Sequence, residues 1–217
     1  MISPDAYRNN FEKASLKEIL KERDALIREI RRYEKGKIPP DTVCLVMKMD
    51  KKVRINTERL CLRSFSDTDA DAAIDILMND EVGKTFMVPD FKSRDDAMRL
   101  FGTLRRLSKA DDRFVYGIYL ENNLIGFIND VEIDGDEIEL GFAIHPDHWG
   151  NGYATEVLRA SIRELLDMDY SVVKTGAFEE NIASIRVMEK CSMTRLDKTD
   201  ELEYRGKVHR CVWFEAR

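Results

Sequence analysis

The sequence lacks paired cysteines. None of its four cysteines belongs to a Cys-x-x-Cys pair, and they are scattered along the chain as Cys44, Cys61, Cys191 and Cys211. Such spacing matches neither the ligand pattern of a structural zinc site nor the framework of a small disulfide-stapled domain. We therefore expect reduced thiols and a cytoplasmic protein.

Histidine, long apolar runs and excess positive charge are also missing. The chain has three histidines, and the two neighbours His145 and His148 have no companion ligands, so no metal site is expected. No apolar run is long enough to span a bilayer, and no signal-peptide pattern opens the chain. A formal net charge of -6 argues against general nucleic-acid binding. We expect a globular protein that binds neither membranes nor nucleic acid.

The 217 residues allow one full domain and a short appendage. The start of the chain has two helix openings, Ser3-Pro4-Asp5 and the capping box Ser15-x-x-Glu18. Apolar residues at intervals of three and four then predict a helix over about 16–35, which Gly36 and the following prolines end. We predict an N-terminal helical extension, residues 1–55, that contains a helical hairpin and a short strand or linker.

A helix with one apolar stripe is not stable alone in water. The stripe of the N-terminal extension must therefore pack on the main domain, on a second copy of the chain or on a partner protein. The sequence leaves these three alternatives open.

Residues 56–217 carry the pattern of a mixed α/β domain. Alternating or continuous apolar runs predict strands over 57–63, 113–120, 124–133, 137–144, 171–178, 193–196 and 208–214. Helical spacing of apolar residues predicts helices over 67–77, 93–108, 152–168 and 181–190. Hairpin turns join the second, third and fourth strands, and the fifth strand should run parallel to the fourth.

The stretch 139–155 has the pattern of an anion-binding site. An apolar strand ends at Pro146, two glycines follow at Gly150 and Gly152, and a helix begins. The first amides of a helix have no partner within it, and the helix dipole favours negative charge there. Gly-x-Gly alone equally fits an ordinary strand-to-helix turn.

The wider string decides between these alternatives. The acyl-CoA-binding core of the GNAT N-acetyltransferases, in particular the RimJ/RimL-like branch, is similar to the string Glu139-x-Gly141-Phe142-x-Ile144-x-Pro146-x-x-Trp149-Gly150-x-Gly152-Tyr153-Ala154-Thr155-Glu156. The resemblance begins at Thr57 and implies an α+β GNAT fold. This fold has a mixed, mostly antiparallel sheet of six to seven strands, splayed between strands four and five, with helices on both faces.

The resemblance also implies acetyl-CoA as co-substrate. In this family the glycine loop holds the pyrophosphate, and the pantetheine arm lies between the splayed strands. The implied cofactor-binding residues are Phe142, Ala143, Ile144, Trp149, Gly150, Asn151, Gly152, Tyr153, Ala154, Thr155, Asn181 and Ser184. Asn181 also fits an ordinary helix N-cap.

The chemistry of acetyl transfer needs a base, an oxyanion donor and an acid. Glu139 matches the glutamate of the family and is the candidate base, although a surface glutamate paired with a lysine is an equal alternative. A backbone N–H near Ala143 or Ile144 is the natural oxyanion donor. The tyrosine that many GNAT enzymes use as acid aligns with Met188, so Ser184 or water must serve.

Two further groups are candidates for the acceptor side. An apolar loop could form a substrate wall or part of the core, and its members are Met87, Val88 and Phe91. An acidic cluster between the last two strands could attract a cationic amine or form a solvated hairpin tip, and its members are Asp197, Asp200, Glu201 and Glu203.

The resemblance predicts an acetyl-CoA-dependent N-acetyltransferase acting on a primary amine, either a peptide N-terminus or a small molecule. The alternative is a non-catalytic acyl-CoA-binding regulatory module whose N-terminal helix engages a partner. A nucleotide-binding protein fits less well, because the loop lacks the Lys-Ser/Thr ending of a P-loop.

Overall fold

The computed structural model describes residues 54–217. The predicted helical hairpin and the predicted linker before residue 54 lie outside the described residues. The strands are β1 (Ile55–Asn56), β2 (Leu60–Arg63), β3 (Val115–Leu120), β4 (Asn123–Asp134), β5 (Glu137–Ile144), β6 (Val172–Phe178), β7 (Thr194–Tyr204) and β8 (Lys207–Ala216). The helices are α4 (Ala70–Leu77), α5 (Asp80–Thr85), α6 (Arg94–Leu107), α7 (Tyr153–Asp167) and α8 (Ile182–Lys190).

The strands of the described region form an eight-stranded sheet in the order β1-β2-β3-β4-β5-β6-β8-β7. Every neighbouring pair is antiparallel except β5 and β6, which are parallel. The mixed, mostly antiparallel sheet is therefore confirmed. Eight strands are present instead of six or seven because Ile55–Asn56 adds a short edge strand to β2.

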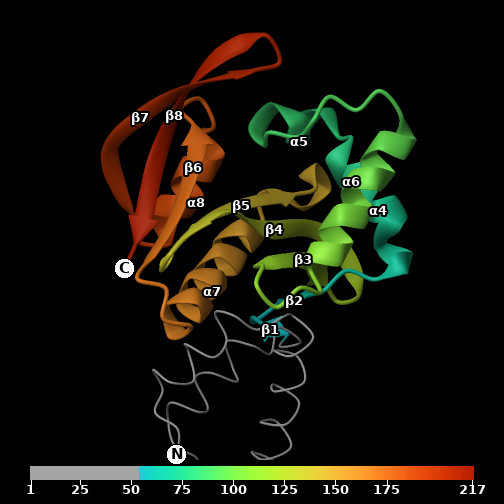
Figure 1. Cartoon of the computed structure of the whole chain (residues 1–217), viewed down its shortest axis with the longest axis horizontal. Coiled ribbons are helices and arrows are strands. Elements are labelled where there is room, and N and C mark those ends of the chain that lie inside the picture. Colours follow the sequence, from blue (N-terminus) through green and yellow to red (C-terminus); the bar gives the residue numbers. More distant parts are fainter. Residues whose placement is uncertain (1–53) are drawn as a thin grey trace, which may run out of the picture. The chain divides into compact units, whose positions relative to one another are not determined.

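Helices cover both faces of this sheet (Figure 1). The two faces are clearest on β4, where Phe127 packs in one core with residues of α4, α5 and α6, and Ile128 packs in the other with residues of α7 and α8. Successive side chains of a strand point to opposite faces, so the two cores lie on either side of the sheet. No helix in the part of the chain described here has the length and apolar character needed to cross a membrane.

Helix α5 was not anticipated from the sequence. It is only six residues long, and Val82 is its one large apolar residue, so no apolar repeat marks it in the sequence. Its start is fixed locally, because the side chain of Asn79 accepts hydrogen bonds from the N–H groups of Glu81 and Val82. This short helix lies above the sheet in Figure 1, near the parting of β5 and β6.

The β7–β8 hairpin is longer than predicted and reaches over the sheet toward α5 (Figure 1). Its tip is anchored there. The Tyr204 hydroxyl lies 2.9 Å from the carbonyl oxygen of Gly83 and 3.2 Å from that of Val88, and Arg205 forms an ion pair with Asp90 at 3.0 Å. The hairpin and the α5 segment are therefore held together on the same side of the sheet.

Candidate active site

The parallel strands β5 and β6 separate soon after they meet. They pair only from Glu137 to Glu139, opposite Val172 to Lys174. From residue 140 onward β5 keeps its other neighbour, β4, but has an open edge toward β6. This edge exposes backbone groups of β5 that a continuous sheet would have used.

The direction of the peptide groups along this edge follows from two contacts. The His145 N–H donates to the Ile125 carbonyl of the β4 side, and the Ile144 carbonyl instead accepts a 2.7 Å hydrogen bond from the Trp149 indole. Because backbone groups alternate in direction along a strand, the Ile144 N–H faces the gap and the Ala143 N–H faces β4.

The loop after β5 depends on two glycines in the left-handed region. Gly150 has φ of 76° and Gly152 has φ of 79°, a conformation that other residues adopt only with strain. A Cβ on Gly150 would meet no atom, so the backbone there is bare. Helix α7 follows Gly152 without any side-chain cap, which leaves the N–H groups of its first turn unsatisfied within the chain.

Asn151 stabilises the loop from within. Its amide nitrogen lies 3.2 Å from the His148 carbonyl oxygen and 3.0 Å from that of Trp149. Asn151 does not line the cavity described below, whereas its neighbours on both sides do. Its side chain thus shapes the loop from within, while Gly150 and Gly152 line the cavity.

Arg59, the residue before β2, holds the same loop in place. Its Nε donates to Glu156 at 2.8 Å, another guanidinium nitrogen donates to the Asn151 carbonyl at 3.0 Å, and the guanidinium lies 4.6 Å from the centre of the Tyr153 ring. Glu156 also accepts hydrogen bonds from the Thr57 hydroxyl and from the Arg59 N–H. Arg59 therefore links the glycine loop to the first turn of α7.

This network also sets the charge of Glu156. Burial alone would raise the pKa of Glu156, but the hydrogen bonds from Thr57 and Arg59 outweigh it and lower that pKa overall. Glu156 is thus a carboxylate at neutral pH, and Arg59 neutralises it beside the glycine loop.

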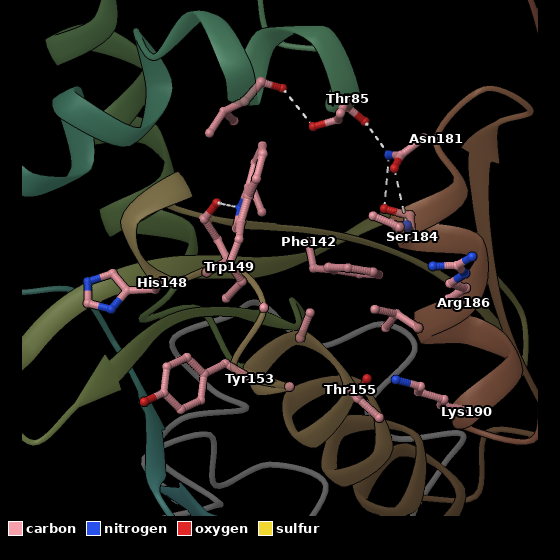
Figure 2. Close-up of a pocket in the computed structure, with 18 residues that line it drawn as sticks. Thr85, Phe142, His148, Trp149, Tyr153, Thr155, Asn181, Ser184, Arg186 and Lys190 are labelled. Atoms are coloured by element: carbon pink, nitrogen blue, oxygen red, sulfur yellow. Dashed lines mark hydrogen bonds between the residues drawn. The ribbon is translucent and has the colours of Figure 1, made fainter.

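A cavity of about 370 Å³ opens between the loop, the free edge of β5 and α8 (Figure 2). All the predicted cofactor-binding residues except Asn151 line it: Phe142, Ala143, Ile144, Trp149, Gly150, Gly152, Tyr153, Ala154, Thr155, Asn181 and Ser184. The structure therefore brings these residues together around one space.

Seven lining residues were missed by the sequence argument: Val82, Thr85, His148, Ala183, Arg186, Val187 and Lys190. The two cations matter most, because Arg186 and Lys190 lie one turn apart on α8 and extend along one side of the cavity (Figure 2). From the sequence, phosphate binding was expected to depend on backbone amides. The repeat of Ala183, Arg186, Val187 and Lys190 at three- and four-residue spacing is the signal that identifies this helix face.

Asn181 and Ser184 form a small polar group at the start of α8. Asn181 accepts a hydrogen bond from the Ser184 N–H at 3.1 Å, and its amide nitrogen lies 2.9 Å from Ser184 Oγ and 3.4 Å from the Thr85 carbonyl oxygen. Asn181 is therefore an N-cap and also connects α8 to α5. Ser184 Oγ accepts the hydrogen bond from Asn181, which leaves its own hydrogen free to donate.

A second cavity of about 450 Å³ lies on the face covered by α4 and α6. It shares Thr85, Phe142 and Ser184 with the first cavity, so the two spaces adjoin where β5 and β6 part. Met87 and Val88 of the predicted apolar loop line this second cavity, and Phe91 does not.

Glu139 lines only the second cavity. Burial raises its pKa, and the nearby charge of Glu132 raises it further. Among the described residues Glu139 has no ion-pair partner. The lysine on the neighbouring strand, Lys174, forms its ion pair with Glu137 instead.

Met188 and Cys211 lie in positions that argue against a direct chemical role for either residue. Met188 belongs to α8, is fully buried in the core and lines neither cavity. Cys211 does line the second cavity, but burial raises the pKa of its thiol. A raised pKa makes this cysteine a poor nucleophile at neutral pH.

Comparisons with known proteins agree with this geometry. The profile of the acetyltransferase (GNAT) domain matches residues 59–194. The uncharacterised N-acetyltransferase YoaA of Bacillus subtilis is 30% identical over 145 residues, which span 63% of this chain and 80% of YoaA.

Solved structures share the fold. A GNAT-family acetyltransferase from Bacillus anthracis superimposes with a TM-score of 0.65 at 22% identity, over 76% of this chain and 98% of that protein. The ribosomal L7/L12 α-N-protein acetyltransferase RimL, solved with coenzyme A, gives a TM-score of 0.68 at 16% identity, over 76% of this chain and 97% of RimL.

Proposed function

This chain belongs to the acetyltransferase (GNAT) family and is an N-acetyltransferase that uses acetyl-CoA, and we propose that it acetylates a primary amine by direct attack in a ternary complex. The acceptor is either a peptide N-terminus or a small amine. The observation that carries the proposal is the pair of cavities that adjoin at Thr85, Phe142 and Ser184. One cavity suits each substrate, and the shared wall is where their reacting ends would meet.

The residues of the first cavity fit coenzyme A. Its diphosphate needs unsatisfied N–H groups, and the bare loop at Gly150 and Gly152 and the uncapped start of α7 offer them. Arg186 and Lys190 add positive charge along the same cavity, which suits the phosphates. The free edge of β5 offers unpaired backbone groups to the amides of the pantetheine arm. Bound acetyl-CoA would supply an activated thioester at the junction.

Glu139 prepares the amine. An alkyl ammonium with a pKa near 10.4 costs about 4 to 5 kcal/mol to deprotonate at pH 7, and an α-ammonium with a pKa near 8 costs about 1 to 1.5 kcal/mol. A carboxylate on the acceptor side can take this proton directly or through one water. The raised pKa of Glu139 makes it a stronger base than an exposed glutamate.

The other two roles fall on the shared wall. The Ile144 N–H, which faces the gap, would donate to the negative charge that develops on the acetyl oxygen. The free hydrogen of the Ser184 hydroxyl points to Ser184 as proton donor to the departing thiolate, which needs little help at a pKa near 8.5. The N–C bond forms as the oxyanion develops, and the C–S bond breaks when this adduct collapses. The ammonium loses two protons in all: one passes through Glu139 to solvent, and the other ends on the departing thiolate.

The test is release of free coenzyme A thiol from acetyl-CoA in the presence of primary amines, with mass spectrometry to detect the added acetyl group. A ternary mechanism predicts intersecting lines when initial rates are measured at varied concentrations of both substrates. Parallel lines would indicate a covalent acetyl-enzyme, for example on Cys211, and would contradict direct attack.

The regulatory alternative predicts a different result in the same assay. Coenzyme A would then raise the melting temperature, no amine would release thiol, and Glu139→Gln would change nothing. Acceptor-dependent thiol release by the wild type, together with its loss in Glu139→Gln, excludes this alternative.

A further inference from the structure

The acceptor-side cavity has few charged side chains. Its walls are mainly aliphatic and aromatic, and the charged residues that line it are Arg113, Asp130 and Glu139. Asp130 is fully buried, forms an ion pair with Arg113 at 2.5 Å, and accepts a 2.6 Å hydrogen bond from the Phe114 N–H. Glu139 is therefore the one carboxylate of this lining without an ion-pair partner within residues 54–217.

Two glycines bring aromatic rings close to the parting strands. A Cβ on Gly141 of β5 would lie 3.1 Å from the Phe86 ring and 3.2 Å from Val131. A Cβ on Gly176 of β6 would lie 3.0 Å from the Trp213 ring. Neither glycine has a side chain that would displace the ring. The Phe86 ring therefore covers β5, and the Trp213 ring covers β6, at the edge of the gap.

Both aromatic surfaces are held in place. The Trp213 indole donates a 2.8 Å hydrogen bond to Asp200, and Trp213 lies directly opposite Gly176 in the β6–β8 register. The Phe86 ring packs edge-on against Phe127, with ring centres 5.3 Å apart. Their positions are thus set by the fold before any acceptor binds.

The acidic cluster of the β7–β8 hairpin leaves this apolar character unchanged. Asp200 is occupied by the Trp213 indole and by Lys198 at 3.2 Å. Glu201 and Glu203 are exposed and alternate with Leu202, which lines the cavity, so they point to the opposite face. Glu132, across the ladder from Glu139, is exposed and does not line the cavity.

From this arrangement, and on the basis of the proposed function, we infer that the acceptor is a monoamine whose nitrogen carries an apolar substituent. The amine lies at Glu139, and the substituent lies between Phe86 with Val131 on one side and Trp213 on the other. A second ammonium group inside this cavity would lose its water and find no unpaired carboxylate, which is strongly unfavourable. Polyamines and aminoglycosides are therefore poor acceptors.

The same chemistry occurs in an alkylamine and in a peptide with an apolar first residue. A matched pair of amines tests whether the acceptor is an alkylamine. Heptylamine and 1,6-diaminohexane have the same length and differ by a terminal methyl or ammonium group. We expect kcat/KM to be about 10- to 100-fold higher for heptylamine. Peptides that begin with leucine or lysine form the second pair. Activity confined to one pair shows whether the acceptor is an alkylamine or a peptide N-terminus.

A charge added at the rim provides an independent readout. Val131 is 53% exposed and lines the cavity, so Val131→Glu should fold and place a carboxylate beside the substituent. The ratio of kcat/KM for heptylamine to that for diaminohexane should fall by about tenfold. Val208→Glu is the matched control, because Val208 is 67% exposed and lines neither cavity, and its ratio should equal that of the wild type.

The outcomes separate this inference from the function on which it rests. Turnover of diaminohexane equal to or faster than heptylamine, with the same order in the peptide pair, overturns the acceptor inference and leaves the acetyltransferase intact. Absence of turnover with every amine and peptide overturns the proposed function itself. An unchanged ratio in Val131→Glu contradicts the assigned position of the substituent.

Discussion

The two cavities that meet at Phe142 and Ser184 are built in different ways. The wall of the coenzyme A side comes mostly from one continuous stretch, residues 142–155, with α8 added across the gap. The acceptor side takes its wall from α4, α6, the α5 segment and strands β4 to β8. The first depends on backbone groups and two left-handed glycines, and the second depends on side chains brought together by the whole fold.

This difference indicates which half of the site is general and which is particular to this chain. Backbone amides at a helix start can bind phosphate without a particular set of side chains, although cations such as Arg186 and Lys190 add to the attraction. The acceptor side has no comparable backbone element, and its shape depends on which aromatic and aliphatic side chains line it. Substitutions on the first side should therefore act on coenzyme A affinity, and those on the second should act on turnover and acceptor choice.

The largest effect should come from removing the carboxylate on the acceptor side. We expect Glu139→Gln to lower kcat by about 10²- to 10⁴-fold, because general-base catalysis contributes about that much. The dissociation constant of coenzyme A, measured by calorimetry, should stay the same. Glu132→Gln, which removes an exposed carboxylate directly opposite in the ladder and with it the smaller contribution to the raised pKa of Glu139, should lower kcat far less. Equal losses in the two variants would contradict the role of Glu139.

The raised pKa of Glu139 gives the same residue a pH signature. Below that pKa the carboxyl is protonated and cannot accept a proton, and the amine must also be unprotonated. The slope of log(kcat/KM) against pH should therefore steepen from about one to about two on going below the pKa of Glu139, at a higher pH than for an ordinary glutamate. Glu139→Gln should keep a slope of about one throughout.

The next effect concerns the glycine loop. Gly152→Ala places a side chain on a residue with φ of 79°, which costs about 1–2 kcal/mol if the loop keeps its shape. We expect coenzyme A to bind about tenfold more weakly, with little change in kcat at saturating acetyl-CoA. Gly102→Ala in α6 is the control, because a Cβ there meets no atom and the helix favours alanine. Unchanged affinity in Gly152→Ala would show that this conformation is not needed.

A smaller effect should follow from removing the Arg59 contacts that hold the glycine loop in place. Arg59→Met removes the contacts to Asn151 and Glu156 and leaves the Glu156 carboxylate unneutralised beside the glycine loop. Coenzyme A affinity should fall by roughly threefold to tenfold, and adding Glu156→Gln should restore part of the loss. Arg94→Met, which breaks an exposed ion pair with Asp71, should leave affinity unchanged. A double variant weaker than Arg59→Met alone would argue against charge neutralisation.

The same contacts predict a pH-dependent loss of stability. Glu156→Gln should lower the free energy of unfolding at pH 7 by about 1–3 kcal/mol, because charged hydrogen bonds from Thr57 and Arg59 are weakened. The folded state lowers the pKa of Glu156, so its contribution exists above the unfolded-state pKa and disappears as pH falls through the folded-state pKa. Urea unfolding at several pH values should show the two proteins converging at low pH. A difference in the free energy of unfolding between wild type and Glu156→Gln that grows as pH falls would contradict this role of Glu156.

The same contrast explains what could be predicted from the sequence. The strand, the two glycines and the start of α7 are neighbours in the chain, so local rules identified them together. Helix α5 was missed because its six residues carry no apolar period and its start depends on one Asn79 cap. Arg59 was missed as a brace because it lies about ninety residues before the loop that it contacts.

The acceptor side was the least predictable part. Nothing near Gly176 in the sequence indicates that the Trp213 ring covers it, since that contact depends on the register of β6 and β8. The hydrogen bond from Trp213 to Asp200 likewise forms only after β7 and β8 pair. Long-range contacts of this kind have no local sequence signal, whereas Glu139 became the candidate base through its resemblance to a family motif.

The most direct test of the two-cavity account is a crystal structure of the protein with coenzyme A. We predict that the diphosphate lies against the N–H groups of Gly150 to Thr155, and that the pantetheine arm runs along the free edge of β5. Its sulfur should lie at the junction beside Phe142 and Ser184, with the acceptor cavity still open. A diphosphate bound elsewhere, or β5 and β6 paired along their full length, would contradict the account.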